Sequence, residues 1–405
     1  MPAQRNLGRA LLECGRVEEA RQQFEQVILA EGDTAIVRCD LGACLQELGR
    51  WGEAEKCHER ALAIDPDFSG AAYNLALTRL YQRKYETAWP LYERRFESAG
   101  MRERLRRDPR SVSLFEGQRR WKGPEDRVEG GVAIWAEQGL GDQVLHSTLI
   151  PELVDAGVPF VYEVDIRMLP AYERSFGKGR FVPWNEPPNE ALLQCGAALM
   201  AGSLPGWFRR NRESFMRQPQ RLLAAAPGRV AHYRGRIDAL GAGLKVALSW
   251  CSRRADRLGP RKSVPLTALA PLLRVPGTTF VDVQYGDTGP ERNSVMAETG
   301  VRLHRLEDVD FLNDLEDVLA VIEACDLLIT TSNATAHLAG ALGKRTWLLV
   351  LSENPPFPYW SHDGGHRSDW YPAVEVLSRK DLETWPELVR YGARRLEALS
   401  SNSSR

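Results

Sequence analysis

Residues 326–351, DLLITTSNATAHLAGALGKRTWLLVL, decide the fold of this chain. The apolar run 327–329 predicts a buried strand, and the small polar residues 330–333 then predict a turn into a helix at 334–342. Gly343 ends the predicted helix, and a second apolar strand follows. The stretch therefore predicts a strand–helix–strand unit of a parallel sheet.

The turn at 330–333 is a candidate phosphate site. In an open parallel sheet such a turn lies at the carboxyl end of a strand, where backbone N–H groups and the helix dipole face the ligand crevice. The alternative is an ordinary packed unit in which Ser, Thr and Asn side chains only cap the helix. The stretch alone leaves both interpretations open, so the rest of the chain must decide between them.

Length and composition narrow the class of protein. The chain has 405 residues, enough for two or three domains, and its formal net charge is -1, whereas a general nucleic-acid binder carries a basic excess. The first residues lack the apolar core of a signal peptide, and no segment approaches the roughly 18 apolar residues of a membrane helix. We expect a soluble cytoplasmic protein without a transmembrane segment and without a nucleic-acid partner.

Three patterns bear on metal binding. Asp308 and Asp310 have the D-x-D form that holds a divalent ion, but they precede a helix start and do not follow a strand. His362 and His366 have the spacing of a zinc pair on a helix, but two glycines lie between them. The seven cysteines are scattered without C-x-x-C spacing. We expect no metal site, a solvated turn at the D-x-D pattern, and reduced, buried cysteines.

The first hundred residues repeat with a period of 34. The sets that keep this interval are Leu7, Leu41 and Leu75; Ala20, Ala54 and Ala88; Phe24, His58 and Tyr92; and Gly32, Pro66 and Gly100. The period, with Leu-Gly in the first helix of a pair and Glu-Ala in the second, resembles that of the tetratricopeptide repeat. We expect three helix pairs over residues 1–100, presenting a concave face to a peptide or protein.

The third repeat departs from the pattern, since Ala76 replaces the glycine of the first helix. We expect this repeat to dock on the segment that follows it. Pro90 should kink its second helix or mark the first turn. Residues 101–130, with a basic run and several glycines, predict an irregular linker.

A second strand-to-helix turn follows the linker. Residues 132–135 predict a strand, and the turn after it contains Gly139 and Gly141, which let a ligand approach the backbone. Asp142 then stands at the start of a helix, where the dipole stabilises its carboxylate anion. Two roles are open for this carboxylate: a helix cap, or a general base whose position the turn fixes.

Strands and helices alternate over the rest of the chain, which predicts two facing Rossmann-like domains with a ligand in the cleft between them. We expect the first at 131–240, the second at 241–390, and a helix end with a polar tail at 391–405. The second domain should include a strand at 301–306.

Three separated motifs carry a family resemblance: AEQGLGDQVLHSTLIPEL at 136–153, TAHLAGALGKRTWLLV at 335–350 and SDWYPAVEVL at 368–377. They are similar to segments of bacterial tetratricopeptide-repeat proteins whose C-terminal part resembles the lipopolysaccharide heptosyltransferases. The resemblance implies a GT-B glycosyltransferase with helical repeats before two Rossmann-like domains. It also implies a nucleotide-sugar co-substrate, inverting transfer, and no cofactor or required metal.

The resemblance assigns roles to single residues. Asp142 matches the proposed general base, Lys262 a basic residue near the donor phosphates, and residues 331–337 the donor-phosphate loop. The residues expected to bind the donor are Gly139, Gly141, Trp250, Arg253, Lys262, Gln284, Thr331, Ser332, Asn333, Ala334, Thr335 and His337. This set suits the reaction, because sugar transfer needs a base for the acceptor proton and positive potential for the leaving phosphate.

Two departures from the family pattern leave the donor and the activity open. Related sequences read D-T-S or D-T-G where this chain has Ser332, Asn333 and Ala334, and A-G-N where it has Cys251, Ser252 and Arg253. Without the carboxylate, an NDP-sugar and a CMP-linked acidic sugar both remain candidate donors.

Two functions follow from the sequence. The first is transfer of a sugar to a protein that the repeats recruit, such as flagellin or another surface protein. The second is a scaffold whose nucleotide-binding part is catalytically silent. The retained Gly139, Gly141 and Asp142 favour the first function, and the altered residues 332–334 favour the second.

Overall fold

The computed structural model describes residues 2–97, 117–137, 139–252, 259, 262–351, 357–360, 366–378 and 384–403. The chain divides into two compact units. The first comprises Met1–Gly117, Ser203–Met216 and Phe357–Ser361, and the second comprises Gln118–Gly202, Arg217–Pro356 and His362–Arg405.

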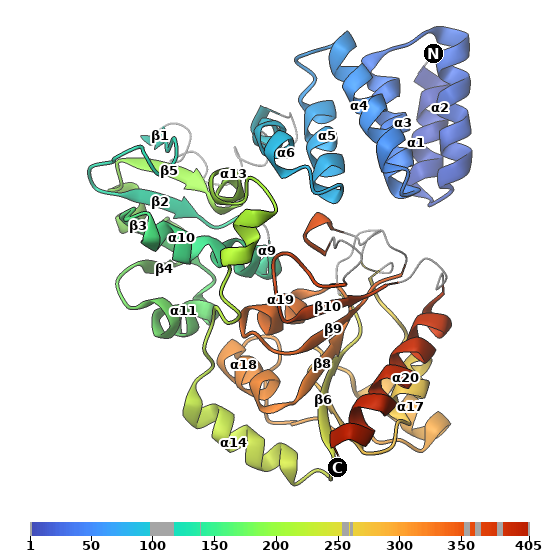
Figure 1. Ribbon diagram of the computed structural model, residues 1–405. Helices are drawn as coiled ribbons and strands as arrows, with labels where there is room; N and C mark the ends of the chain where they lie inside the picture. Colours follow the sequence, from blue (N-terminus) through green and yellow to red (C-terminus); the bar gives the residue numbers. More distant parts are fainter. Residues whose placement is uncertain are drawn as a thin grey trace. The chain divides into compact units, whose positions relative to one another are not determined.

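The first unit consists mainly of helix pairs that stand side by side (Figure 1). Its helices are α1 (Pro2–Glu13), α2 (Val17–Glu31), α3 (Ala35–Glu47), α4 (Trp51–Ile64), α5 (Ser69–Tyr81) and α6 (Tyr85–Tyr92). The repeated small residues explain the pairing. A Cβ atom on Gly8 would lie 2.7 Å from the Phe24 ring, and one on Gly42 would lie 2.4 Å from the His58 ring. Each glycine therefore makes room for the ring of the partner helix.

The third helix pair packs on a segment from much later in the chain, residues 203–216. Trp89 donates its indole N–H to the backbone oxygen of Arg209 at 2.7 Å, and a guanidinium nitrogen of Arg95 donates to Ser203 Oγ at 2.9 Å. Helix α6 contains Pro90 and continues as the 3-10 helix η1 (Glu93–Glu97). The third repeat therefore docks on residues 203–216, and residues 98–116, which directly follow it, lie outside the described residues.

The second unit contains two parallel five-stranded sheets. The first is built from β1 (Arg119–Arg120), β2 (Val132–Trp135), β3 (Phe160–Val164), β4 (Phe181–Pro183) and β5 (Ala197–Met200), in the order β1-β5-β2-β3-β4. Its main helices are α9 (Leu140–His146), α10 (Ile150–Asp155), α11 (Leu169–Phe176) and α12 (Glu190–Leu193).

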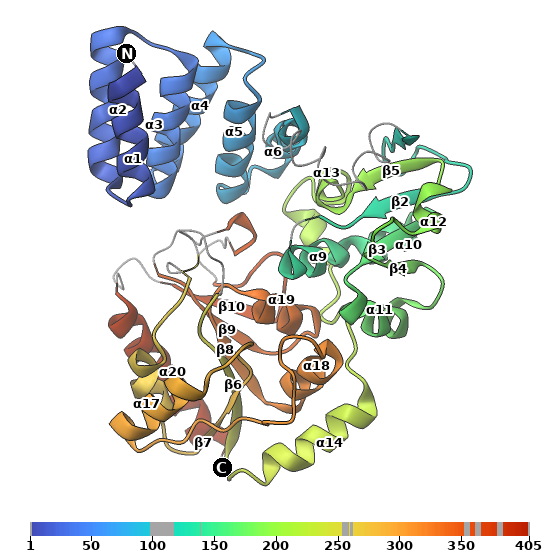
Figure 2. The ribbon, with the colours of Figure 1, turned by 180° about the vertical axis from the view of Figure 1, so that it is seen from behind.

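The second sheet has the order β10-β9-β8-β6-β7. Its strands are β6 (Leu244–Ser249), β7 (Thr278–Asp282), β8 (Leu327–Thr330), β9 (Thr346–Leu349) and β10 (Val374–Leu377). Helices α14 (Pro227–Asp238) and α18 (Leu315–Ala324) lie on one side, and α17 (Gly289–Thr299) and α20 (Trp385–Ser403) on the other (Figure 2). Helix α14, which we expect at the end of the first domain, packs against α18 of the second sheet.

The prediction of a strand at 301–306 is wrong. In the structure this segment makes a single parallel bridge, between His304 and Val281 of β7. The pairing stops there because a turn begins at Leu306, whose backbone oxygen accepts a hydrogen bond from the N–H of Val309. The bridge still occupies the position of the third strand in a Rossmann sheet of order 3-2-1-4-5-6.

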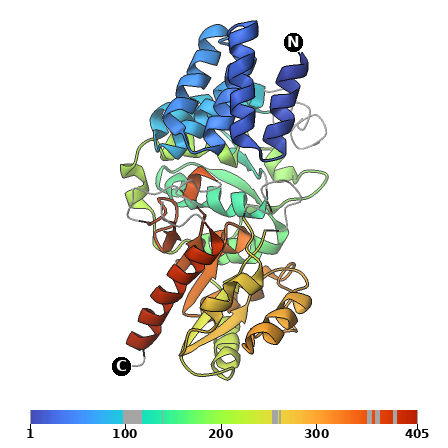
Figure 3. The same ribbon diagram turned by 90° about the vertical axis from the view of Figure 1, so that its right-hand side faces the viewer.

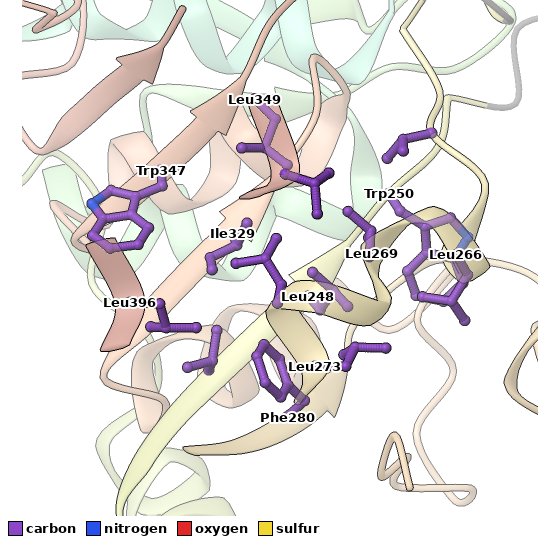
Figure 4. Close-up of a cluster of buried hydrophobic side chains, with 14 of the residues drawn as sticks. Leu248, Trp250, Leu266, Leu269, Leu273, Phe280, Ile329, Trp347, Leu349 and Leu396 are labelled. Atoms are coloured by element: carbon purple, nitrogen blue, oxygen red, sulfur yellow. The ribbon is translucent and has the colours of Figure 1, made fainter. Parts of the chain in front are cut away.

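The core of the second sheet is apolar and closely packed (Figure 4). Leu248, Phe280 and Ile329 come from three strands and meet Leu269 and Leu396 from the helices on one face. Such burial is the main stabilising term of the domain. Helical repeats thus precede two Rossmann-like sheets, and the predicted fold class is confirmed.

Helix α20 is a single continuous helix of 19 residues (Figure 3). Leu388, Val389 and Leu396 are buried on one face of it, and Arg390, Arg394 and Glu397 are exposed on the other, as in an ordinary surface helix. Across the part of the chain that the structure describes, no helix is both long enough and apolar enough to span a membrane.

Candidate functional site

Both sheets of the second unit reverse their strand order at a central pair of strands. The reversal lies between β2 and β5 in the first sheet and between β6 and β8 in the second. Ligands of open parallel sheets bind outside the carboxyl ends of the strands at such points. Strand β2 leads into α9 and β8 leads into α19 (Ala334–Ala341), so both turns singled out in the sequence lie at these positions.

Asn333 holds the β8–α19 turn together. Its Oδ1 accepts a hydrogen bond from the backbone N–H of Ala336 at 3.3 Å, which caps the helix. Its Nδ2 donates to Ser249 Oγ at 2.8 Å and to the backbone oxygen of Cys251 at 3.3 Å. This side chain is therefore engaged in joining α19 to the end of β6, and it positions the turn.

Gln284 also binds the end of β6. Its Oε1 accepts hydrogen bonds from Ser249 Oγ at 2.9 Å and from the backbone N–H groups of Trp250 and Cys251, both at 3.0 Å. The side chain is fully buried. Gln284, predicted to contact the donor, instead fixes the backbone that borders the crevice.

Thr331 supplies a buried polar atom that the fold does not use. The residue is 1% exposed, and within the described ranges its Oγ1 has no hydrogen-bond partner. Buried hydroxyl groups normally have one. Ser332 and Thr335 are also buried beside the start of α19, where helix geometry leaves backbone N–H groups without intrahelical partners. This arrangement is suited to an anionic group of a ligand.

His337 lies one turn into α19 and is 3% exposed. Its Nδ1 lies 3.0 Å from the hydroxyl oxygen of Tyr371. Burial, together with the positive charges of Lys262 and His146, lowers the pKa of His337 to about 3. The imidazole is therefore neutral near pH 7, and the positive charge beside this turn comes from the buried Lys262.

Helices α9 and α19 contact each other directly at this site. A Cβ atom on Gly141 would lie 2.8 Å from Cδ2 of His337, so only glycine permits this approach. The contact brings the neighbouring Asp142 close to the second sheet. Burial raises the pKa of Tyr371 well above its ordinary value, and the charges of Tyr172 and Asp142 raise it further.

Asp142 itself is half-buried at the start of α9. Its Oδ2 accepts a long hydrogen bond, 3.4 Å, from the backbone N–H of Gly139. The carboxylate thus caps the helix, and its partial exposure is also compatible with a base that meets a substrate. The structure leaves both predicted roles open and brings Asp142, Lys262 and His337 into one site.

Buried carboxylates accept hydrogen bonds from the backbone at and beside the β2–α9 turn and so stabilise it. Glu137 Oε2 accepts the backbone N–H of Gly202 at 3.0 Å, which ties the end of β2 to the end of β5. Glu163 Oε2 accepts the backbone N–H of Ala136 at 3.1 Å. Sequence reasoning missed Glu137, Glu163 and Tyr371, although Glu137 and Tyr371 stand inside two of the quoted motifs.

Four further residues are predicted to bind the donor: Trp250, Ala334, Gly139 and Arg253. The ring of Trp250 packs in the core of the second sheet (Figure 4), and its Nε1 donates to Glu291 Oε2 at 3.2 Å, so only its backbone borders the crevice. Ala334 is half-buried at the start of α19, and Gly139 is exposed before α9. Arg253 lies outside the described residues.

The patterns weighed as metal sites have other partners. Asp308 is paired with Arg236 at 2.6 and 2.8 Å, and Asp310 accepts the side-chain amide of Asn313 at 2.9 Å, as expected of a turn. His362 lies outside the described residues. Among the residues the structure does describe, no group of three or more His, Cys, Asp or Glu could hold a metal ion. All seven cysteines are among the described residues and none forms a disulfide, but Cys14 is exposed, contrary to the expectation of burial.

Comparison with known proteins identifies the first part of the chain. Residues 2–67 match the family model described as the tetratricopeptide repeat. These residues are tetratricopeptide repeats. The chain is also similar to Protein FlbA of Caulobacter vibrioides, with 29% identity over 424 residues that cover 94% of this chain and 70% of FlbA.

Two solved structures resemble the part that contains the sheets. The ADP-heptose lps heptosyltransferase II of E. coli is 15% identical and covers 68% of this chain and 100% of its own, with a TM-score of 0.46. A glycosyl transferase family 9 protein of Veillonella parvula is 12% identical and covers 68% and 99%, with a TM-score of 0.49. The function of this chain must therefore be argued from its own residues.

Proposed function

We propose that this protein is a glycosyltransferase that moves a sugar from a nucleotide-sugar donor to a hydroxyl group of a protein acceptor. The observation that carries the proposal is the contact between α9 and α19 at Gly141 and His337. It brings the Asp142 carboxylate beside a turn whose Thr331 hydroxyl is buried and lacks a partner within the described residues. Sugar transfer requires a general base and a binding site for the donor phosphates in the same crevice.

In the proposed reaction the acceptor oxygen attacks the anomeric carbon of the donor sugar. The new carbon–oxygen bond forms as the bond from that carbon to the phosphate oxygen breaks, with inversion at the anomeric carbon. Asp142 takes the proton of the acceptor hydroxyl, and the electron pair of the broken bond leaves with the nucleotide. Asp142 stands in the first turn of α9, directly after the turn that contains Gly139 and Gly141. This turn fixes the position of the carboxylate, which suits it to the role of base.

The leaving nucleotide needs positive potential and hydrogen-bond donors. We propose that Lys262, the backbone N–H groups at the start of α19 and the Thr331 hydroxyl supply them, so that transfer proceeds without a required metal. Loss of one such donor commonly lowers the rate by about a hundred-fold. The nearly complete burial of residues 331–333 supports this assignment, because hydrogen bonds are stronger where water is excluded.

The tetratricopeptide repeats indicate the class of acceptor. The tetratricopeptide repeats are suited to binding a polypeptide, so we propose that they recruit a protein acceptor, such as flagellin or another surface protein, in the cytoplasm. The donor is an NDP-sugar or a CMP-linked acidic sugar.

A second candidate function is a scaffold with a silent nucleotide-binding part. The observation that favours it concerns Asn333. Its side chain is hydrogen-bonded to Ser249, Cys251 and Ala336 and so serves the fold. In the related pattern a threonine stands there, next to a carboxylate that this chain replaces with Ser332. A site kept only for stability would tolerate such replacements.

A thermal-shift screen with UDP-, GDP-, ADP- and CMP-sugars separates the two functions. A ligand present at a hundred times its Kd stabilises the native state by about 2.7 kcal/mol, so a true donor should raise the melting temperature clearly. The best donor is then incubated with the protein and with flagellin and other surface proteins as acceptors, and release of free nucleotide is measured. A donor that binds without any release of nucleotide supports the silent scaffold. If none of the four classes binds, both functions fail.

A further inference from the structure

A groove in the second unit lies away from the candidate donor site. Helices α16 (Ala270–Leu273) and α20 form its walls, and its volume is about 350 Å³. It is lined by Arg274, Arg390, Arg394 and Glu397, together with an apolar surface made by two prolines, Val275 and Ala393.

The side chains of the three arginines of this groove are exposed. None of their guanidinium groups makes a hydrogen bond or ion pair with any residue in the ranges that the structure describes. Arg395 on the same helix behaves differently, since it forms two hydrogen bonds to Glu375 at 2.6 and 3.2 Å. The groove therefore concentrates positive charge that the protein does not neutralise itself.

The spacing of the arginines adds to this charge. Arg390 and Arg394 are four residues apart on α20 and so lie on one face of the helix, an arrangement of like charges that is slightly destabilising. Arg274 faces the same space from the end of α16. An anionic ligand would relieve the repulsion among the three.

The groove is separate from the crevice that holds the candidate donor site. Arg274 and Val275 directly precede β7, at the amino end of that strand. The turns that follow β6 and β8 lie at the carboxyl ends of strands that run parallel to it. The groove therefore lies at the amino ends of the strands, opposite the carboxyl ends where the candidate donor site is found. Its function does not depend on the proposed transfer.

We propose that this groove is a docking site for an acidic segment of a partner protein that also carries apolar side chains. Guanidinium groups bind carboxylates in a two-pronged geometry, and they are weakly hydrated, which suits arginine to protein interfaces. The apolar surface between them accommodates aliphatic side chains of the same segment.

The lining also disfavours other anions. Glu397 repels a dense polyanion such as RNA or a polyphosphate, whereas its carboxylate can accept the backbone N–H groups of a peptide. A nucleic-acid strand would leave the proline and valine surface without an apolar partner. The mixed lining thus fits a peptide that alternates acidic and apolar residues.

The test uses the full chain and a fluorescent peptide in which glutamate and leucine alternate, followed by fluorescence anisotropy. Arg394→Glu should weaken binding at least ten-fold, because it reverses one of the three positive charges that line the groove. Lys178→Glu is the matched control, since this exposed lysine lies in the turn between α11 and β4 and its replacement changes the net charge equally. The control should bind within two-fold of the unaltered protein.

Further probes decide the chemistry of the partner. A peptide with glutamine in place of glutamate, and one with serine in place of leucine, should each bind at least five-fold more weakly. The proposal is wrong if the alternating peptide does not bind, if Arg394→Glu binds it normally, or if an RNA oligonucleotide binds more tightly. Donor-induced thermal shifts should be the same in Arg394→Glu and the unaltered protein, which separates failure here from failure of the proposed transfer.

Discussion

The two turns that meet at the candidate site are built in different ways. The β2–α9 turn has an exposed glycine and the half-buried Asp142, and buried carboxylates hold it from behind through its backbone. The β8–α19 turn is buried almost throughout, and the neutral side chains of Asn333 and Gln284 fix it. In the proposed transfer, the open turn would present its charged group to varied acceptors, and the closed turn would hold one fixed anion.

The largest expected effect concerns the charged group of the open turn. Asp142→Asn should lower nucleotide release from the donor by about a thousand-fold, because the amide cannot take the acceptor proton. Donor binding by thermal shift should be unchanged, since the phosphate seat belongs to the other turn. Asp155→Asn, an exposed carboxylate on α10, serves as the control and should retain full activity. Normal nucleotide release by Asp142→Asn would leave Asp142 as a helix cap only.

The next effect concerns the buried hydroxyl of the closed turn. Thr331→Val keeps the shape of the side chain and removes an oxygen that has no partner among the described residues, so the melting temperature without ligand should not fall. Donor affinity should fall about ten- to a hundred-fold if this hydroxyl binds the donor phosphate. Isothermal titration with the best donor measures the change. A lower melting temperature with unchanged donor affinity would show that the hydroxyl serves the fold instead.

A smaller effect tests the contact that joins the two turns. Gly141→Ala places a methyl group 2.8 Å from the His337 ring and should separate α9 from α19. We expect nucleotide release to fall about ten-fold and stability to fall by about 1–3 kcal/mol from overpacking. Gly139→Ala is the matched control, because its φ is -88° and the nearest atom to its new methyl group would be Asp142 Oδ2, at 3.9 Å. Equal effects of the two substitutions would contradict a special role for this contact.

The same comparison shows what could be predicted from the sequence. Strand, turn and helix are local patterns, so both turns and the repeats could be found from apolar periodicity and from the positions of glycine and small residues. The roles of Asn333 and Gln284 could not, because each depends on Ser249, which is 84 residues from Asn333 and 35 from Gln284. Trp250 was predicted to bind a ligand, but its ring lies in the core, because a strand end places alternate side chains on opposite faces.

The smallest effect concerns the neutral histidine of the closed turn. The folded-state pKa of His337, about 3, is below the ordinary value of 6.5, so the unfolded chain binds this proton more readily than the native protein. The contribution of His337 to stability is complete above pH 6.5 and is lost as the pH falls towards 3. Between pH 6.5 and pH 5 the loss should be about 2 kcal/mol, at about 1.4 kcal/mol per unit.

His337→Gln isolates this contribution, because glutamine can keep a hydrogen bond to Tyr371 but does not titrate. Urea unfolding of the second unit, followed for both proteins at pH 7 and pH 5, gives the difference between their losses of stability. The unaltered protein should lose about 2 kcal/mol more than His337→Gln, since all other titrating groups are shared. Equal losses would mean that the imidazole takes up its proton as readily in the folded protein as in the unfolded chain. The closed turn would then present a charged histidine to the donor at pH 5, and its contrast with the open turn would disappear there.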